Sequence, residues 1–141
     1  MVETKLPRKP SVLIRLALDD LRKVETDERY TIDMDVWHAP KDDYSKCTVC
    51  LVGSVMAKSL EIDSGSPCFP SRDFFSQADC TALKALEWFR LGHVFAAFSF
   101  LDVPWDEQLQ RKVSITPYAL DRDKFQRDME HLATLLDQKG Y

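Results

Sequence analysis

The stretch that decides the fold is "CTVCLVGSVMAKSL", residues 47–60, an almost continuous apolar run in a chain of 141 residues. Its 14 residues favour a buried helix over a strand, because strands of this kind usually end after about 4 to 8 residues. Its valines oppose that preference, since β-branched side chains are restricted in a helix. Gly53 and Ala57 are small enough to let another backbone approach closely. We therefore expect a central helix over residues 47–60.

Segments on both sides of this run have the spacing of amphipathic helices. Ser11 follows Pro10 as an N-cap, and apolar residues recur at steps of three and four up to Val24. Ser76-x-x-Asp79 resembles a capping box, and the helix behind it reaches Gly92, a C′ glycine. Two further helices are expected, over residues 93–101 and from Asp121 to Gly140.

A period of two replaces the helical period between Tyr30 and Trp37, as in a half-exposed strand. The partner of similar character is "KVSIT", residues 112–116, and residues 61–72 have the glycine and prolines of a loop. The predicted fold class is mainly α. We expect one compact domain over residues 1–141 with four to five helices, a two-stranded β ribbon as an optional addition, and a flexible segment over residues 1–10.

Charge and hydropathy exclude several classes of function. The net charge is −4, and residues 19–43 alone hold nine acids against four bases, a net −5. Nucleic-acid binding depends on a basic surface, so we expect none. Residues 94–101 form the longest uncharged apolar run, far below the about 20 residues that span a bilayer. We expect no membrane association and a cytoplasmic protein.

The cysteines permit a rival hypothesis. Cys47-x-x-Cys50 has zinc-knuckle spacing, but Cys68 and Cys80, the residues that would complete four ligands, are separated by eleven residues. We therefore expect buried, reduced thiols, no metal, no cofactor and no catalytic residues. The alternative is a Cys/His-dependent enzyme or zinc protein centred on His38, Cys47 and Cys50.

Tryptophans beside acids indicate a partner-binding surface. Trp88 adjoins the inward stripe of its helix and is assigned to the core, whereas Trp105 is followed by two acids. An aromatic side chain ringed by carboxylates suits a partner with a basic surface, although indoles that cover the core rim would have the same sequence. Self-association is also compatible with the small residues of the central run. The predicted partner-binding residues are Asp33, Asp35, Trp37, His38, Asp42, Asp43 and Trp105.

Several motifs resemble a small family of uncharacterised accessory proteins of tailed bacteriophages. They are "LALDDLRKVETDERY", Asp33-x-Asp35-Val-Trp37-His38 and Cys47-x-Val-Cys50-Leu-x-Gly53-x-Val-Met-Ala57-Lys58. The resemblance covers about residues 12–60, and beyond them only the general run "ALKALEWFRLG" fits. It implies a phage product of the bacterial cytoplasm that binds and inhibits a host protein, including a defence enzyme.

Overall fold

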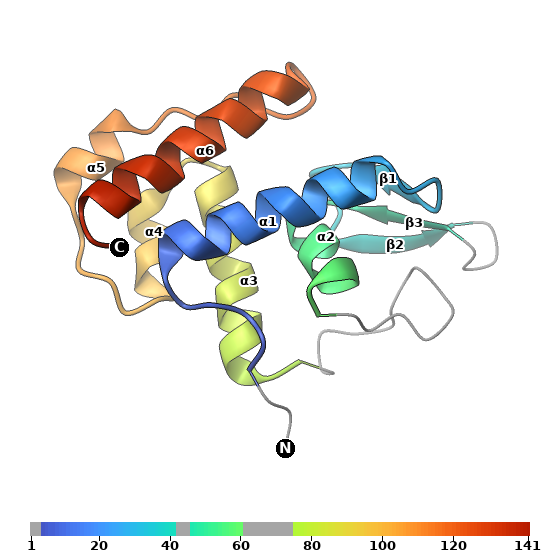
Figure 1. Cartoon of the computed structure of the whole chain (residues 1–141), viewed down its shortest axis with the longest axis horizontal. Helices are drawn as coiled ribbons and strands as arrows, with labels where there is room; N and C mark the ends of the chain where they lie inside the picture. The colour runs from blue at the N-terminus through green and yellow to red at the C-terminus, as the bar shows by residue number, and fades with distance from the viewer. Residues whose placement is uncertain (1–3, 42–45, 61–74) are drawn as a thin grey trace.

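The computed structural model describes residues 4–41, 46–60 and 75–141, which form six helices and a three-stranded sheet (Figure 1). The helices are α1 (Pro10–Glu25), α2 (Leu51–Lys58), α3 (Gln77–Arg90), α4 (Val94–Ser99), α5 (Glu107–Lys112) and α6 (Arg122–Gln138). The strands are β1 (Tyr30–Ile32), β2 (His38–Lys41) and β3 (Lys46–Val49). The mainly α fold with a small sheet is confirmed. The described residues form six helices where four to five were expected, and three strands where two were expected.

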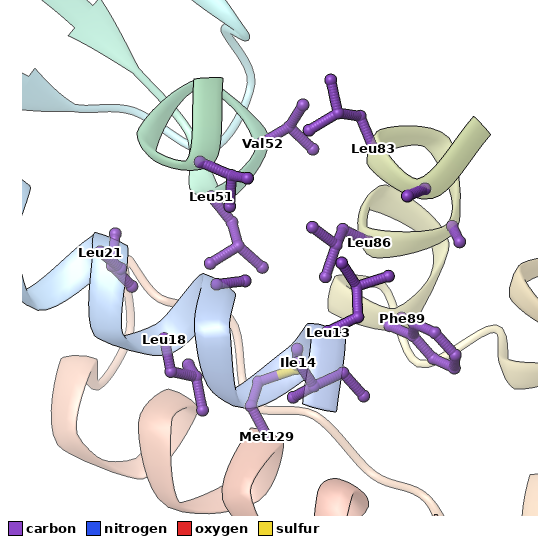
Figure 2. Close-up of a cluster of buried hydrophobic side chains, with 14 of the residues drawn as sticks. Leu13, Ile14, Leu18, Leu21, Leu51, Val52, Leu83, Leu86, Phe89 and Met129 are labelled. Carbon is purple, nitrogen blue, oxygen red and sulfur yellow. The ribbon is translucent and has the colours of Figure 1, made fainter. Parts of the chain in front are cut away.

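Helix α1 lies at the centre of the helical layer and contacts α2, α3 and α6. Leucines and an isoleucine from its inward stripe meet apolar side chains of the three neighbours, as Figure 2 shows. Many of these side chains are fully buried, among them Leu13, Ile14, Leu18, Leu83 and Phe89. Each such side chain contributes about 1.5–3 kcal/mol through removal of apolar surface from water. The predicted amphipathic stripes therefore form the core.

The central run is divided between a strand and a helix, so the prediction of one helix over residues 47–60 was wrong at its start. In β3 burial alternates, with Cys47 and Val49 buried and Lys46 exposed, which is the period of a strand. Cys50 has an extended backbone and begins α2 as its N-cap. Of the three valines that opposed a helix, Val49 lies in β3, whereas Val52 and Val55 lie in α2.

The sheet has the strand order β1-β3-β2, with β1 parallel and β2 antiparallel to β3. Tyr30 lies opposite Cys47, and His38 lies opposite Val49. The predicted partner strand at residues 112–116 was wrong, because Lys112 ends α5 and the following residues are irregular. The true pairing is local. Its second strand contains Pro40, a residue that disfavours a strand prediction.

Gly53 fixes how the sheet sits on α2. A Cβ atom added there would collide with the carbonyl group of Trp37 and lie 2.8 Å from the Cβ atom of Val49. The prediction that small residues in this run admit another backbone is confirmed at this position. The chain between β1 and β2 therefore rests directly on the first turns of α2.

The predicted cap of α3 is confirmed, but the prediction of Ser11 as the N-cap of α1 was wrong. Helix α1 begins at Pro10 with Lys9 at the N-cap position, because proline suits the first helical position, and the buried Ser11 hydroxyl instead donates to the Tyr141 carbonyl at 2.9 Å. The Ser76 hydroxyl accepts a hydrogen bond from the Asp79 amide at 3.0 Å, and Asp121 caps α6 through the Lys124 amide. Gly92 has a φ of +81°, as expected for a C′ glycine. Helix α5 was not predicted, because its six residues contain only one buried side chain, Leu109.

The side chain of Asp79 has a role that the capping-box pattern did not predict. It accepts hydrogen bonds from the backbone amides of Lys5 and Leu6 at 2.8–3.0 Å. Leu6 is buried. The described part of the N-terminal segment is therefore hydrogen-bonded to α3, and the flexibility expected over residues 1–10 stays a prediction.

Candidate functional site

The turn that follows β1 places two of the predicted aspartates on the surface. The Asp33 amide donates to the Val49 carbonyl at 2.9 Å, and the Val36 amide donates to the Asp33 carbonyl at 3.1 Å. The Asp33 carboxylate accepts a hydrogen bond from the Asp35 amide at 3.0 Å, which stabilises the turn locally. Both aspartates are exposed. We refer to residues 33–36 as the acidic turn.

A cleft of about 720 Å³ lies between the acidic turn and the helical layer. One wall consists of β1, the acidic turn and Thr48 of β3. The opposite wall consists of Arg90 at the end of α3, the loop that precedes α6, and Arg122. The polar side chains that line it are Thr31, Asp33, Asp35, Thr48, Arg90, Tyr118 and Arg122.

The two cations on the far wall already have anionic partners. Arg122 donates to Glu25 at 3.0 Å, and Arg90 is paired with Glu87 one helical turn away. The Tyr118 hydroxyl donates to Glu25 at 2.9 Å. Burial, followed by this carboxylate, raises the pKa of Tyr118 to about 12, so the phenol stays protonated at neutral pH.

The charge that remains in the cleft is therefore negative. Neither Asp33 nor Asp35 forms an ion pair with any residue in the part of the chain that the structure describes. An anionic ligand would meet these two carboxylates, whereas a cationic ligand would be attracted to them. The cleft thus favours a cation.

The other predicted partner-binding residues do not join this cleft. Trp37 is partly buried and packs against the core, which fits the alternative interpretation of an indole that covers the core rim. His38 begins β2 and is partly buried. Asp42 and Asp43 lie outside the described residues. Trp105 lines a separate hollow.

Two of the four thiols, those of Cys47 and Cys50, are buried as the sequence predicted. Cys47 and Cys50 are at most 1% exposed. Burial raises the pKa of Cys50 to about 11, so this thiol is not a thiolate nucleophile at neutral pH. Cys80 is partly exposed, and Cys68 lies outside the described ranges. Among the described residues no group of three or more His, Cys, Asp or Glu side chains could hold a metal ion. These observations give the Cys/His alternative no support.

The separate hollow has a volume of about 350 Å³ and is lined by Trp88, His93, Phe95, Ala96, Trp105 and Gln110. We refer to it as the aromatic hollow. The assignment of Trp88 to the core was wrong, because its side chain is 38% exposed. It lies one residue before the buried Phe89, and helical periodicity cannot separate the edge of a buried stripe from its centre. The acidic cleft and the aromatic hollow share no lining residue.

Comparison with known proteins does not assign a family to this chain. No family model, no curated protein and no solved structure matches it. The resemblance to phage accessory proteins therefore stays a prediction. Within the described ranges no helix has the length and apolar character needed to cross a membrane.

Proposed function

We propose that this chain is a non-enzymatic binding protein that takes a cationic segment of a partner protein into the cleft beside Asp33 and Asp35. The observation that carries the proposal is the unbalanced charge of that cleft. Its arginines are neutralised by Glu25 and Glu87, and its aspartates have no described cation beside them.

The position of the carboxylates suits a steering role. They are exposed on a turn that is held by backbone hydrogen bonds to Val49 and by the close approach of Trp37 to Gly53. A rigid turn keeps the two charges in place before the partner arrives, which lowers the ordering cost of binding. Exposed charges of this kind act mainly on the association rate and are screened by salt.

The resemblance to phage accessory proteins indicates which kind of partner the cleft would bind. A phage accessory protein in a bacterial cell would use the cleft to bind a basic surface of a host protein, and so modulate or inhibit that protein. A basic surface that normally contacts nucleic acid is one class of target that an acidic cleft would fit.

The first test uses a double variant, Asp33→Asn with Asp35→Asn, and a defined cationic probe, a nine-residue arginine peptide. We expect the variant to bind the peptide at least about tenfold more weakly than the wild type at low ionic strength. The difference should shrink as the ionic strength rises to about 0.5 M, where the screening length falls below the size of the cleft. Fluorescence anisotropy of labelled peptide measures both.

The matched control removes the same charge elsewhere. Glu28 and Asp102 are exposed and do not line the cleft, so Glu28→Gln with Asp102→Asn changes the net charge equally. This control should bind the peptide like the wild type. Equal weakening of both double variants would show a general charge effect and would contradict a site in the cleft.

The natural partner can be sought with the same variants. Affinity capture from bacterial lysate with the wild type, the control and the cleft variant gives three protein lists by mass spectrometry. A partner that binds in the cleft is retained by the first two and lost with the third.

A further inference from the structure

The aromatic hollow lies at the end of the helical layer formed by α3, α4 and α5 and collects exposed aromatic rings from consecutive segments. Trp88 comes from α3, Phe95 from α4 and Trp105 from the segment before α5, and they are 38%, 55% and 59% exposed. His93, the residue before α4, adds a fourth ring. Large apolar side chains that gather on one exposed patch mark binding sites more often than scattered ones do.

The rings stand nearly perpendicular in pairs. The Phe95 and Trp105 rings have centroids 5.3 Å apart at an angle of 65°, and those of Trp88 and His93 are 5.7 Å apart at 71°. Rings at steep angles to one another present π faces in more than one direction, and all four of these rings line the hollow. Such an arrangement favours a cation, because each face carries the negative part of the ring quadrupole.

Gln110, a polar residue of the lining, already uses both ends of its side chain within the fold. Its side-chain oxygen accepts from the Phe95 amide at 2.9 Å, and its amide group donates to the Gly92 carbonyl at 3.3 Å. A primary ammonium group needs acceptors for its N–H donors and would find fewer here than in water. A quaternary ammonium group has no N–H donor and loses no hydrogen bond.

The charges of the lining do not oppose a cation. No Lys or Arg side chain is among its lining residues. The two residues after Trp105 are acids. Asp106 is paired with Lys139 at 3.2 Å, and Glu107 is paired with Arg111. A bound cation would therefore meet ring faces without a competing protein cation in the lining.

We propose that the aromatic hollow binds a quaternary ammonium group, held by cation–π contacts with Trp88, Phe95 and Trp105. The site goes beyond the proposed function, since it shares no lining residue with the acidic cleft. The group can belong to a small molecule such as choline or to a trimethylated lysine of a peptide. Both sources present the same chemistry.

The test compares choline with two analogues that separate the contributions. 3,3-Dimethyl-1-butanol has the same shape without the charge, and ethanolamine has the charge with N–H donors. Titrations followed by saturation-transfer NMR should show choline binding at least about fivefold more tightly than either analogue. Equal binding of choline and the neutral alcohol, or no binding of choline, would overturn the proposal.

Variants locate the site. Trp105→Leu keeps an apolar side chain but removes the ring with the largest exposed fraction of the three, and should weaken choline binding about tenfold. Leu120→Ala is the control, because Leu120 is 79% exposed and lies outside the hollow. Choline binding that survives Trp105→Leu would also overturn the proposal.

A short peptide whose only charged side chain is one trimethylated lysine distinguishes the two sources. Tighter binding of the peptide than of choline supports the site and assigns the group to a protein, and equal binding supports the site with a small-molecule ligand. The arginine-peptide experiment on the acidic cleft is independent of all these results, so either proposal can fail alone.

Discussion

Two groups of aspartates in this chain differ in the burial and the hydrogen bonding of their carboxylates. Asp20 in α1 and Asp79 in α3 are at most 2% exposed and are hydrogen-bonded within the fold. Asp33 and Asp35 in the acidic turn are exposed and have no described ion-pair partner. All four count equally in the net charge of −4. The difference shows that the availability of a carboxylate depends on the backbone around it and not on how many acids the sequence contains.

The largest effect is expected when the buried carboxylate of Asp79 is removed. Asp79→Ala would leave the Lys5 and Leu6 amides without their acceptor and release the N-terminal segment from α3. Loss of these charge-assisted hydrogen bonds should lower the free energy of unfolding by about 2–4 kcal/mol. Urea denaturation measures the loss, and amide hydrogen exchange at Lys5 and Leu6 locates it.

A control separates the anchor from the helix cap. Ser76→Ala removes the N-cap of the same helix and leaves the Asp79 carboxylate in place, so it should cost only about 1 kcal/mol. It should not speed exchange at Lys5 and Leu6. If Asp79→Ala were no more harmful than Ser76→Ala, the internal role of this carboxylate would be wrong.

Asp20 is also internal, but its burial opposes folding at neutral pH. Burial raises its pKa to about 6, and this effect exceeds the opposing hydrogen bond from Ser59 and the attraction of Lys23. The folded state therefore holds a proton between about pH 4 and pH 6 that the unfolded state has lost, so this residue lowers the stability as the pH rises through that window.

Asp20→Asn should accordingly stabilise the protein at pH 7. The amide is nearly isosteric, and its oxygen can still accept the Ser59 hydrogen bond. A rise of the pKa from 3.8 to about 6 corresponds to about 3 kcal/mol, measured as the difference between the free energies of unfolding of the two proteins. The gain should vanish near pH 4, where Asp20 is protonated in the folded state. A gain that does not depend on pH would have a different cause.

These contrasts show how far sequence patterns reach. The stripes of α1, α3 and α6 and the Ser76 cap follow from local spacing, and the structure confirms them, whereas the predicted Ser11 cap was wrong. The sheet does not follow, because its central strand lies inside an apolar run whose length favours a helix. Strand pairing between residues 38–41 and 46–49 is a tertiary outcome that overrides this local preference.

The candidate site was predictable only in its acidic half. The period of two after Tyr30 predicts that Asp33 and Asp35 lie on one side of the chain, and both line the cleft. The opposite wall comes from α3, from the loop before α6 and from the first residue of α6. No sequence pattern near the aspartates predicts that Arg90 or Arg122 lies beside them. Trp105 was correctly placed on the surface, but its neighbours in the aromatic hollow are set by the packing of α3, α4 and α5.

The smallest expected effect completes the comparison. The double variant Asp33→Asn with Asp35→Asn should change the free energy of unfolding by less than about 0.5 kcal/mol, because neither exposed side chain forms an ion pair with a described residue. The asparagine at position 33 can still accept the amide hydrogen bond that stabilises the turn. The same variant is expected to bind the arginine peptide at least about tenfold more weakly than the wild type at low ionic strength. If it instead unfolded as readily as Asp79→Ala, the acidic turn would be held by its carboxylates, and weaker binding would report on a damaged scaffold. A stable variant that fails to bind is the combination that separates a surface carboxylate from an internal one.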